Sequence, residues 1–123
     1  MKIIDTNIVL RYLLNDHEEL SKKAVEIITT GEALILSQVV AEVVYVLKGV
    51  YNLERQEIVE ALMSVVKMDN IHFENEDIIN LALSEYASTS LDFVDTILIG
   101  YRKIEGREVI TFDKKLNKRL AEI

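Results

Sequence analysis

Short apolar runs alternate with longer amphipathic stretches along this chain of 123 residues. The short runs are rich in β-branched residues and bounded by polar ones, which is typical of buried strands. They cover residues 2–5, 33–36, 71–73 and 108–111. In the longer stretches apolar residues recur with the period of a helix. These cover residues 7–14, 17–29, 37–48, 54–67, a stretch after Asn75, 93–104 and 114–120. Strands that alternate with helices predict an α/β fold, a three-layer α/β/α sandwich around a central parallel sheet.

The ends of the predicted helices carry residues suited to them. Ser, Asn and Asp side chains can accept hydrogen bonds from the free N–H groups of a first helical turn. We therefore expect N-caps at Asp16, Ser37, Asn75 and Asp92. Glycine readily adopts the left-handed conformation that ends a helix. We therefore expect helices to stop at Gly31, Gly49 and Gly106.

The composition limits the kinds of site that the chain can carry. Half of the residues are hydrophobic, enough for one domain over residues 1–123 with a buried core. The absence of cysteine excludes disulfides, thiolate zinc sites and cysteine nucleophiles. His17 and His72 have no metal-ligand spacing, so each is interpreted as a surface or strand-edge residue. No apolar run is long enough for a membrane span and no leader precedes the first strand, so we expect a cytoplasmic protein.

Charge is unevenly distributed along the chain. The net charge is −7, with −10 over residues 1–95 and +3 over residues 96–123. The acidic balance argues against broad, nonspecific coating of nucleic acid. The basic residues of the C-terminal part could still hold a phosphate backbone, although a solvated face would have the same composition. They are Arg102, Lys103, Arg107, Lys114, Lys115, Lys118 and Arg119.

Two aspartates end strand-like runs. Asp5 follows the first run and Asp113 follows the last. In open α/β sheets, ligands bind just beyond the carboxyl ends of the strands. Each aspartate could instead cap the helix that follows it, which would also satisfy its charge. Thr6 and Asn7 beside Asp5, and Thr111 before Asp113, could orient these carboxylates.

Two further acids lie in helix-like stretches. Glu42 is the only charged residue from Ser37 to Leu47, and a charge among apolar residues usually has a partner or a function. It could also face solvent on a narrow stripe. Asp95 follows Asp92 by three residues, so both lie near the N-terminus of one helix face. We assign Asp92 to the cap and Asp95 to a ligand, although both could simply serve the helix dipole.

Taken together, Asp5, Glu42, Asp95 and Asp113 predict a site for a divalent metal. Like charges about 5 Å apart repel by roughly 3 kcal/mol per pair at an effective dielectric near 20, and a cation would relieve that cost. Sites made of oxygen ligands suit magnesium or manganese. The residues therefore favour a metal-dependent phosphodiesterase in which water is the nucleophile.

Four pieces of the chain resemble the PIN-domain family, and in particular its VapC-type toxins from toxin–antitoxin pairs. The pieces are Ile4-Asp5-Thr6-Asn7, Ser37 to Glu42, Phe93-Val94-Asp95-Thr96 and Ile110-Thr111-Phe112-Asp113. They follow one another at family-like spacing and cover essentially the whole chain. One position departs from the family pattern, because Thr96 stands where a small alanine is common.

The resemblance implies a magnesium- or manganese-dependent ribonuclease whose acidic cluster is Asp5, Glu42, Asp95 and Asp113. Asp5 and Asp95 would be the most direct ligands. It also implies RNA as substrate, a cognate antitoxin protein that silences the activity, and a homodimer. The stretches 7–14 and 54–67 carry more apolar residues than one small sheet can cover, so an exposed interface is expected there. The residues are Ile8, Leu10, Tyr12 and Leu13 in the first stretch, and Val50, Tyr51 and Leu53 just before the second.

Two alternatives remain open at the level of sequence. The chain could be a catalytically inert PIN-like interaction or regulatory domain, which RNA cleavage by the purified protein would exclude. It could also be a receiver-like phosphoacceptor domain. That domain would need an aspartate on a middle strand, where the chain offers only Asp69 before Ile71.

Overall fold

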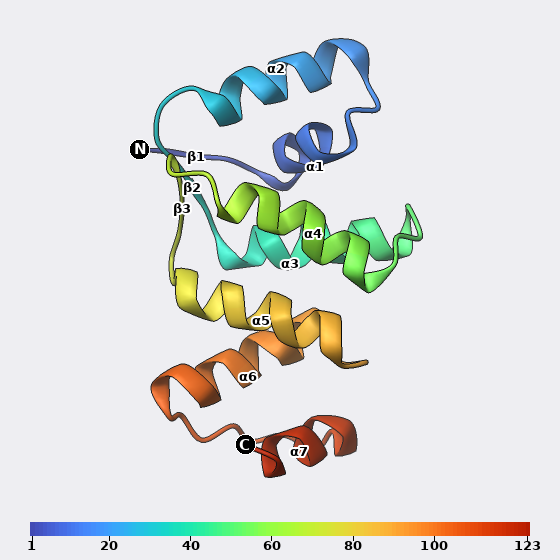
Figure 1. The fold of residues 1–123 in the computed structure, drawn as a ribbon, viewed down its shortest axis with the longest axis vertical. Coiled ribbons are helices and arrows are strands. Elements are labelled where there is room, and N and C mark those ends of the chain that lie inside the picture. Colours follow the sequence, from blue (N-terminus) through green and yellow to red (C-terminus); the bar gives the residue numbers. More distant parts are fainter. The chain divides into compact units, whose positions relative to one another are not determined.

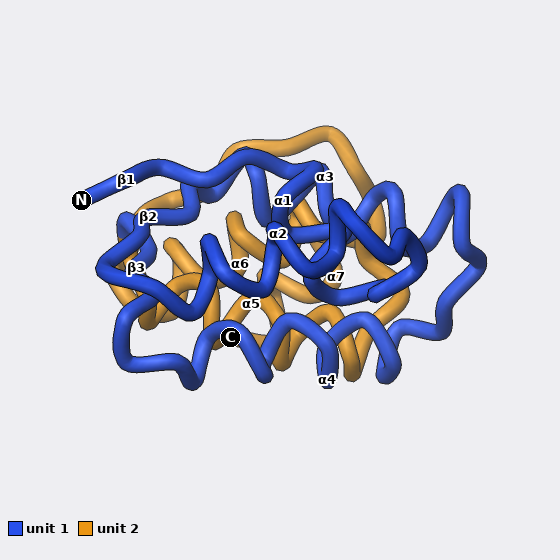
Figure 2. Tube along the Cα trace, turned by 90° about the horizontal axis from the view of Figure 1, so that it is seen from above, with its two compact units in different colours: residues 1–74 blue, residues 75–123 orange.

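The computed structural model describes all 123 residues, which divide into two compact units (Figure 2). Unit 1 is residues 1–74 and unit 2 is residues 75–123. Unit 1 contains β1 (Lys2–Ile3), α1 (Thr6–Leu14), α2 (Glu18–Thr29), β2 (Ala33–Ile35), α3 (Ser37–Gly49), α4 (Arg55–Val66) and β3 (Ile71–Phe73). Unit 2 contains α5 (Glu76–Ser88), α6 (Phe93–Glu105) and α7 (Lys114–Ala121) (Figure 1). No helix is long and apolar enough to cross a membrane.

Three short strands of unit 1 form one parallel sheet in the order β1-β2-β3. Leu34 is in register with Ile3 on one side and with His72 on the other. The middle strand, β2, is the most buried, because Ala33 and Ile35 are 0% and 2% exposed. Helix α3 contacts both α1 and α4, and α4 also contacts β3. The short β-branched runs thus form strands as predicted at three of the four positions.

Unit 2 is built from helices alone. α5 and α6 pack closely, because Gly100 allows α6 to approach Ile78; a Cβ built on Gly100 would lie 3.0 Å from Cγ2 of Ile78. α7 contacts α6, and Leu116 of α7 joins a small buried cluster with Leu91 and Ile99. α6 ends as predicted, with Gly106 in the left-handed conformation.

The prediction of a fourth strand over residues 108–111 is wrong. These residues form no regular element. Ile110, within the segment, is 79% exposed, and Phe112, just after it, is 103% exposed. The apolar run is compatible with a strand, but a strand also needs a neighbour that accepts and donates backbone hydrogen bonds. Here the groups of Thr111 bond locally instead, its carbonyl to the Asn117 side chain and its hydroxyl to the Asp113 N–H.

The prediction that residues 2–5 are buried is also wrong, except at Ile4. Lys2 is exposed and Ile3 is 62% exposed, whereas Ile4 is 3% exposed. The reason is the position of β1 at an edge of the sheet, where it pairs only with β2. An edge strand can carry exposed side chains that a central strand cannot.

Two of the four predicted N-caps are found at their predicted positions. Asn75 caps α5, accepting from the N–H of Ile78 at 3.2 Å, and Asp92 precedes α6, whereas Asp16 and Ser37 need correction. His17, not Asp16, caps α2, because its Nδ1 accepts the N–H of Leu20 at 3.1 Å. Asp16 instead accepts from the Arg11 guanidinium at 2.7 Å. Ser37 is the first residue of α3 rather than its cap, and Asp92 takes the cap position of α6 without a side-chain hydrogen bond.

The expected exposure of apolar residues in residues 7–14 is not observed. Leu10 is buried, and Ile8, Tyr12 and Leu13 are half-buried, because α1 is covered by both α2 and α3. The turn after α3 differs, since Val50 is 68% and Tyr51 36% exposed.

Candidate functional site

The carboxyl edge of the sheet carries two acids of unit 1. Asp5, Leu36 and Glu74 come after the last residues of β1, β2 and β3, so all three lie beyond the carboxyl ends of these parallel strands. Asp5 leaves β1 in an extended conformation, and its Oδ1 accepts the N–H of Ile8 at 3.0 Å, so it caps α1. Such an edge is where open α/β sheets bind ligands.

Glu74 is an acid of this edge that sequence reasoning did not single out. Its Oε1 accepts the N–H of Ser37 at 2.9 Å, at the start of α3. Leu36, the residue at the cap position, has no polar side chain, so an acid from the next strand takes over the capping role. The signal was available, because Glu74 follows a strand-like run as Asp5 does.

Glu42 lies on α3, the helix that contacts α1, but its side chain is exposed. The prediction that it is a charge surrounded by core residues is therefore wrong, and the alternative of a narrow solvent-facing stripe describes it correctly. Val43 and Val44, which follow it, are buried. The apolar neighbours in sequence thus point to the core while Glu42 faces away from them.

Asp95 and Asp113 belong to unit 2, where they lie within electrostatic reach of each other. Asp95 is half-buried in the first turn of α6. Burial raises the pKa of the Asp95 carboxyl, and the nearby Asp113 and Asp92 raise it further, while Lys115 lowers it. A raised pKa at an acid means that its negative charge is not fully compensated. A bound cation would supply that compensation.

Asp113 caps α7, accepting the N–H of Leu116 at 2.8 Å. Its own N–H donates to the hydroxyl of Thr111 at 3.0 Å, so Thr111 orients the backbone of Asp113 rather than its carboxylate. Thr96, beside Asp95, is fully buried and donates its hydroxyl to the carbonyl of Phe93 at 2.6 Å. It therefore fits the position where an alanine would also fit, because its polar group is satisfied within its own helix.

The donor set suits a hard divalent cation. In neither unit do three or more acidic or histidine side chains converge in an arrangement that could hold a metal ion. Each unit contributes two of the predicted ligands, Asp5 and Glu42 in unit 1 and Asp95 and Asp113 in unit 2. Asp95 and Asp113 lie within electrostatic reach of each other. Capping engages one oxygen of Asp5 and one of Asp113. An ionised carboxylate has about four acceptor positions, so capping does not prevent either from binding a metal.

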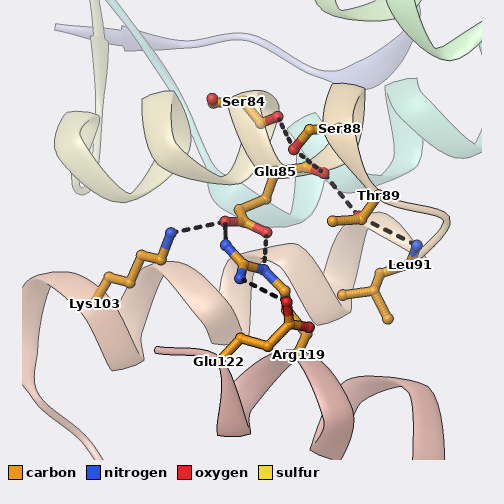
Figure 3. A network of polar contacts seen from close by, with 8 residues as sticks. All are labelled: Ser84, Glu85, Ser88, Thr89, Leu91, Lys103, Arg119 and Glu122. Carbon is orange, nitrogen blue, oxygen red and sulfur yellow. Dashed lines mark hydrogen bonds and ion pairs between the residues drawn. The ribbon is translucent and has the colours of Figure 1, made fainter.

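Glu85, in the middle of α5, is a second residue that sequence reasoning missed. It is only 4% exposed, and its carboxylate accepts from Lys103 Nζ at 2.9 Å, Arg119 Nε at 2.9 Å and Arg119 Nη2 at 2.6 Å (Figure 3). The Arg119 hydrogen bonds lower the pKa of Glu85 to about 2, helped by Lys103 and opposed by burial. Its place on the apolar stripe of α5, seven residues after Ile78 and three after Ala82, was the available signal.

Comparison with known proteins gives two matches. The sequence matches the family model of the PIN domain over residues 2–121. It is also 26% identical to a VapC ribonuclease of Aquifex aeolicus (strain VF5), in an alignment that covers 96% of this chain and 91% of that protein. No solved structure gives a significant match.

Proposed function

The chain belongs to the PIN domain family, and we propose that it is a metal-dependent endoribonuclease, the toxin of a type II toxin–antitoxin pair. Family membership and the parallel sheet confirm the predicted fold class, a PIN-like α/β/α sandwich. They also set aside the receiver-like alternative. The single domain over residues 1–123 stays a prediction. The observation that supports the chemistry best is the half-buried acid Asp95 in unit 2, whose pKa is raised by burial and by the nearby Asp113.

In this proposal Asp5, Glu42, Asp95 and Asp113 hold magnesium or manganese. When bound, the ion would polarise a phosphoryl oxygen of the RNA and lower the pKa of a water molecule. The capped geometry of Asp5 and Asp113 fixes one oxygen of each carboxylate, which limits side-chain rotation before any ligand arrives. Exposed Glu42 can accept a proton from water or coordinate directly. None of the four proposed ligands is a histidine, so the proposal assigns proton transfer to carboxylates and water.

The proposal is tested by RNA cleavage with purified protein. Cleavage should require magnesium or manganese, stop in excess chelator, and fall by at least 100-fold in Asp95→Asn. Because burial and Asp113 both disfavour the charged form of Asp95, the neutral Asn should leave the folded protein at least as stable. Lost activity would then not reflect unfolding, which thermal melting checks.

Asp77→Asn is the matched control, because Asp77 lies in the first turn of α5 as Asp95 lies in the first turn of α6, but Asp77 is exposed whereas Asp95 is half-buried. It should cleave like the unmodified protein. Undiminished cleavage in chelator would refute the metal mechanism. Absence of cleavage under all conditions would favour the inert interaction domain instead.

The partner proteins are the finer part of the proposal. We propose that the chain forms a homodimer and binds a cognate antitoxin. We also propose that it cleaves RNA and binds the antitoxin in the cytoplasm. Exposed apolar side chains on α3 and the turn after it, Tyr45, Val50 and Tyr51, support a protein interface in unit 1. Sedimentation at micromolar concentration measures self-association directly, and a monomer with full activity would refute the dimer.

A further inference from the structure

Helix α7 has few apolar contacts to hold it in place. It has eight residues, of which only Leu116 is buried. Leu120 is half-buried against the same small cluster of Leu91 and Ile99. The apolar contacts of α7 therefore all run to one small cluster. Polar contacts on other parts of α7 can then help to set its direction, and with it the position of Asp113 at its N-terminus.

The segment before α7 adds one apolar contact, because Val109 packs against the same cluster as Leu116. Residues 107–113 form no helix or strand. The hydrogen bonds of this segment near Asp113 run to α7 itself, since Asn117 donates to the carbonyl of Thr111 at 2.9 Å and Leu116 donates to Asp113. The end of the segment thus moves with α7 rather than restraining it.

Two polar contacts attach α7 to the rest of unit 2. Lys115 donates to the carbonyl of Ser90 at 3.3 Å, and Arg119 forms the stronger contact, a charged bidentate pair with the buried Glu85 of α5 (Figure 3). A guanidinium that meets both oxygens of a carboxylate fixes direction as well as distance. Glu85 also accepts from Lys103 of α6, so one buried carboxylate holds two neighbouring helices. Thr89 in turn donates to the carbonyl of Glu85 at 2.7 Å, at the C-terminal end of α5.

The two acids and the two cations have a regular arrangement along these helices. Asp95 lies in the first turn of α6 and Asp113 caps α7, while Lys103 and Arg119 lie further along the same helices. At about 1.5 Å per residue, Asp113 is roughly 9 Å along the axis from Arg119. If Arg119 were released, α7 could tilt about the buried Leu116, which lies about 4.5 Å along the axis from Asp113, and the tilt would change the distance between Asp113 and Asp95.

We propose that Glu85 is a positioning residue, which through Arg119 and Lys103 fixes α6 and α7 so that Asp113 stays beside Asp95 to share a cation. This inference rests on the proposed function for the identity of the ligand, Mg²⁺ or Mn²⁺. The spacing of Asp95 and Asp113 can be tested without any metal. Glu85 itself contacts neither substrate nor metal in this role.

The first experiment measures Mn²⁺ binding by calorimetry with the full chain. Glu85→Gln should weaken Mn²⁺ binding at least tenfold. Arg119→Lys keeps the positive charge but cannot form the bidentate hydrogen bonds, so it should weaken Mn²⁺ binding by a smaller factor. Leu83→Ala is the matched control, because Leu83 is fully buried on the same helix and its truncation destabilises without touching this ion pair. It should change Mn²⁺ affinity less than twofold at a temperature where all variants are folded. Equal affinities for Glu85→Gln and Leu83→Ala would overturn the proposal.

The second experiment measures the spacing in the absence of metal. The chain has no cysteine, so Asp95→Cys with Asp113→Cys gives a single thiol pair. A short bifunctional reagent that fluoresces only when both thiols have reacted should link this pair. The yield of linked protein should fall several-fold when Glu85→Gln is added. It should not change when Leu83→Ala is added. An unchanged yield with Glu85→Gln would overturn the positioning role. Normal linking together with no Mn²⁺ binding by the unmodified protein would overturn the proposed function instead and leave the positioning role supported.

Discussion

Asp5 and Asp113 have the same local structure but different supports. Each follows an apolar run, adopts an extended conformation, and caps a helix by accepting the N–H group three residues further on, at 3.0 Å for Asp5 and 2.8 Å for Asp113. Before Asp5 the backbone belongs to a parallel sheet, with Ile4 donating to the carbonyl of Leu34 at 3.2 Å. Before Asp113 there is no strand, and the helix after it is held by Leu116 and by the Glu85–Arg119 pair.

The difference shows that one sequence motif can be positioned by two kinds of force. A strand ladder uses backbone groups, which every residue except proline carries, so it depends little on side-chain charge. The Glu85 pair depends wholly on charge and on burial. A buried pair is also costly to desolvate, so it is better understood as fixing a geometry than as adding stability over an apolar alternative. The position of Asp113 should therefore depend on the charge of Glu85 and Arg119, whereas the position of Asp5 should depend little on side-chain charge.

The largest expected effect on stability comes from removing the Glu85 charge. Glu85→Gln should lower the free energy of unfolding at pH 7 by about 3 kcal/mol, since breaking a buried pair by removing one partner costs roughly 3–5 kcal/mol. We expect the lower end of this free-energy range because the side chains of Lys103 and Arg119 are 30% and 25% exposed, so water can hydrate them when Glu85 is neutralised. Urea denaturation measures this change.

Glu19→Gln is the control for that measurement. Glu19 pairs with Lys23 across one turn of α2 in unit 1, and both side chains are more than 60% exposed. Its loss should change the unfolding free energy by no more than about 0.5 kcal/mol. Similar small effects for Glu85→Gln and Glu19→Gln would mean that apolar contacts alone hold α7, and the comparison between the two regions would fail.

Acid should weaken the same pair in a defined pH range. The pKa of Glu85 is lowered from 4.5 to about 2 in the folded protein, mainly by the Arg119 hydrogen bonds. A lowered folded-state pKa gives stability that is fully present above the unfolded value, near pH 4.5, and is lost as the pH falls toward 2. The total loss is about 3 kcal/mol. Denaturation between pH 5 and 2 measures it, and the slope should be shallower in Glu85→Gln. Parallel curves for the two proteins would show that other carboxylates cause acid unfolding.

The sequence predicted the elements whose causes are local. Asn75 caps α5 and Gly106 ends α6 because a cap or a left-handed residue acts within a few positions of the chain. The runs at 33–35 and 71–73 form strands because each finds a parallel neighbour. Residues 108–111 have the same kind of pattern and form none, since pairing depends on a neighbour that the local pattern does not describe.

The parts of the candidate site that escaped prediction depend on residues far apart in the chain. Glu74 caps α3 from 37 residues away, and Glu85 meets Arg119 across 34 residues. A glutamate in a helix is usually exposed, so only its place on the apolar stripe distinguished Glu85. Glu42 shows the opposite error, because apolar neighbours in sequence do not show which face of a helix a charge occupies. Metal binding by the four acids is still a prediction from the residues and the family.

The smallest expected effect concerns the two caps and separates capping from metal binding. Asp5→Ala and Asp113→Ala should each lower the unfolding free energy by about 1 kcal/mol, because each removes a side-chain acceptor at a helix N-terminus. Asp5→Asn and Asp113→Asn should have almost no effect on stability, because asparagine caps as well as aspartate. All four variants should lose ribonuclease activity, because neither alanine nor the neutral amide can replace a charged metal ligand. Denaturation and cleavage assays on the same four proteins measure both properties. If Asp113→Asn kept full activity, Asp113 would be a cap alone, and the likeness between the two aspartates would end at local structure.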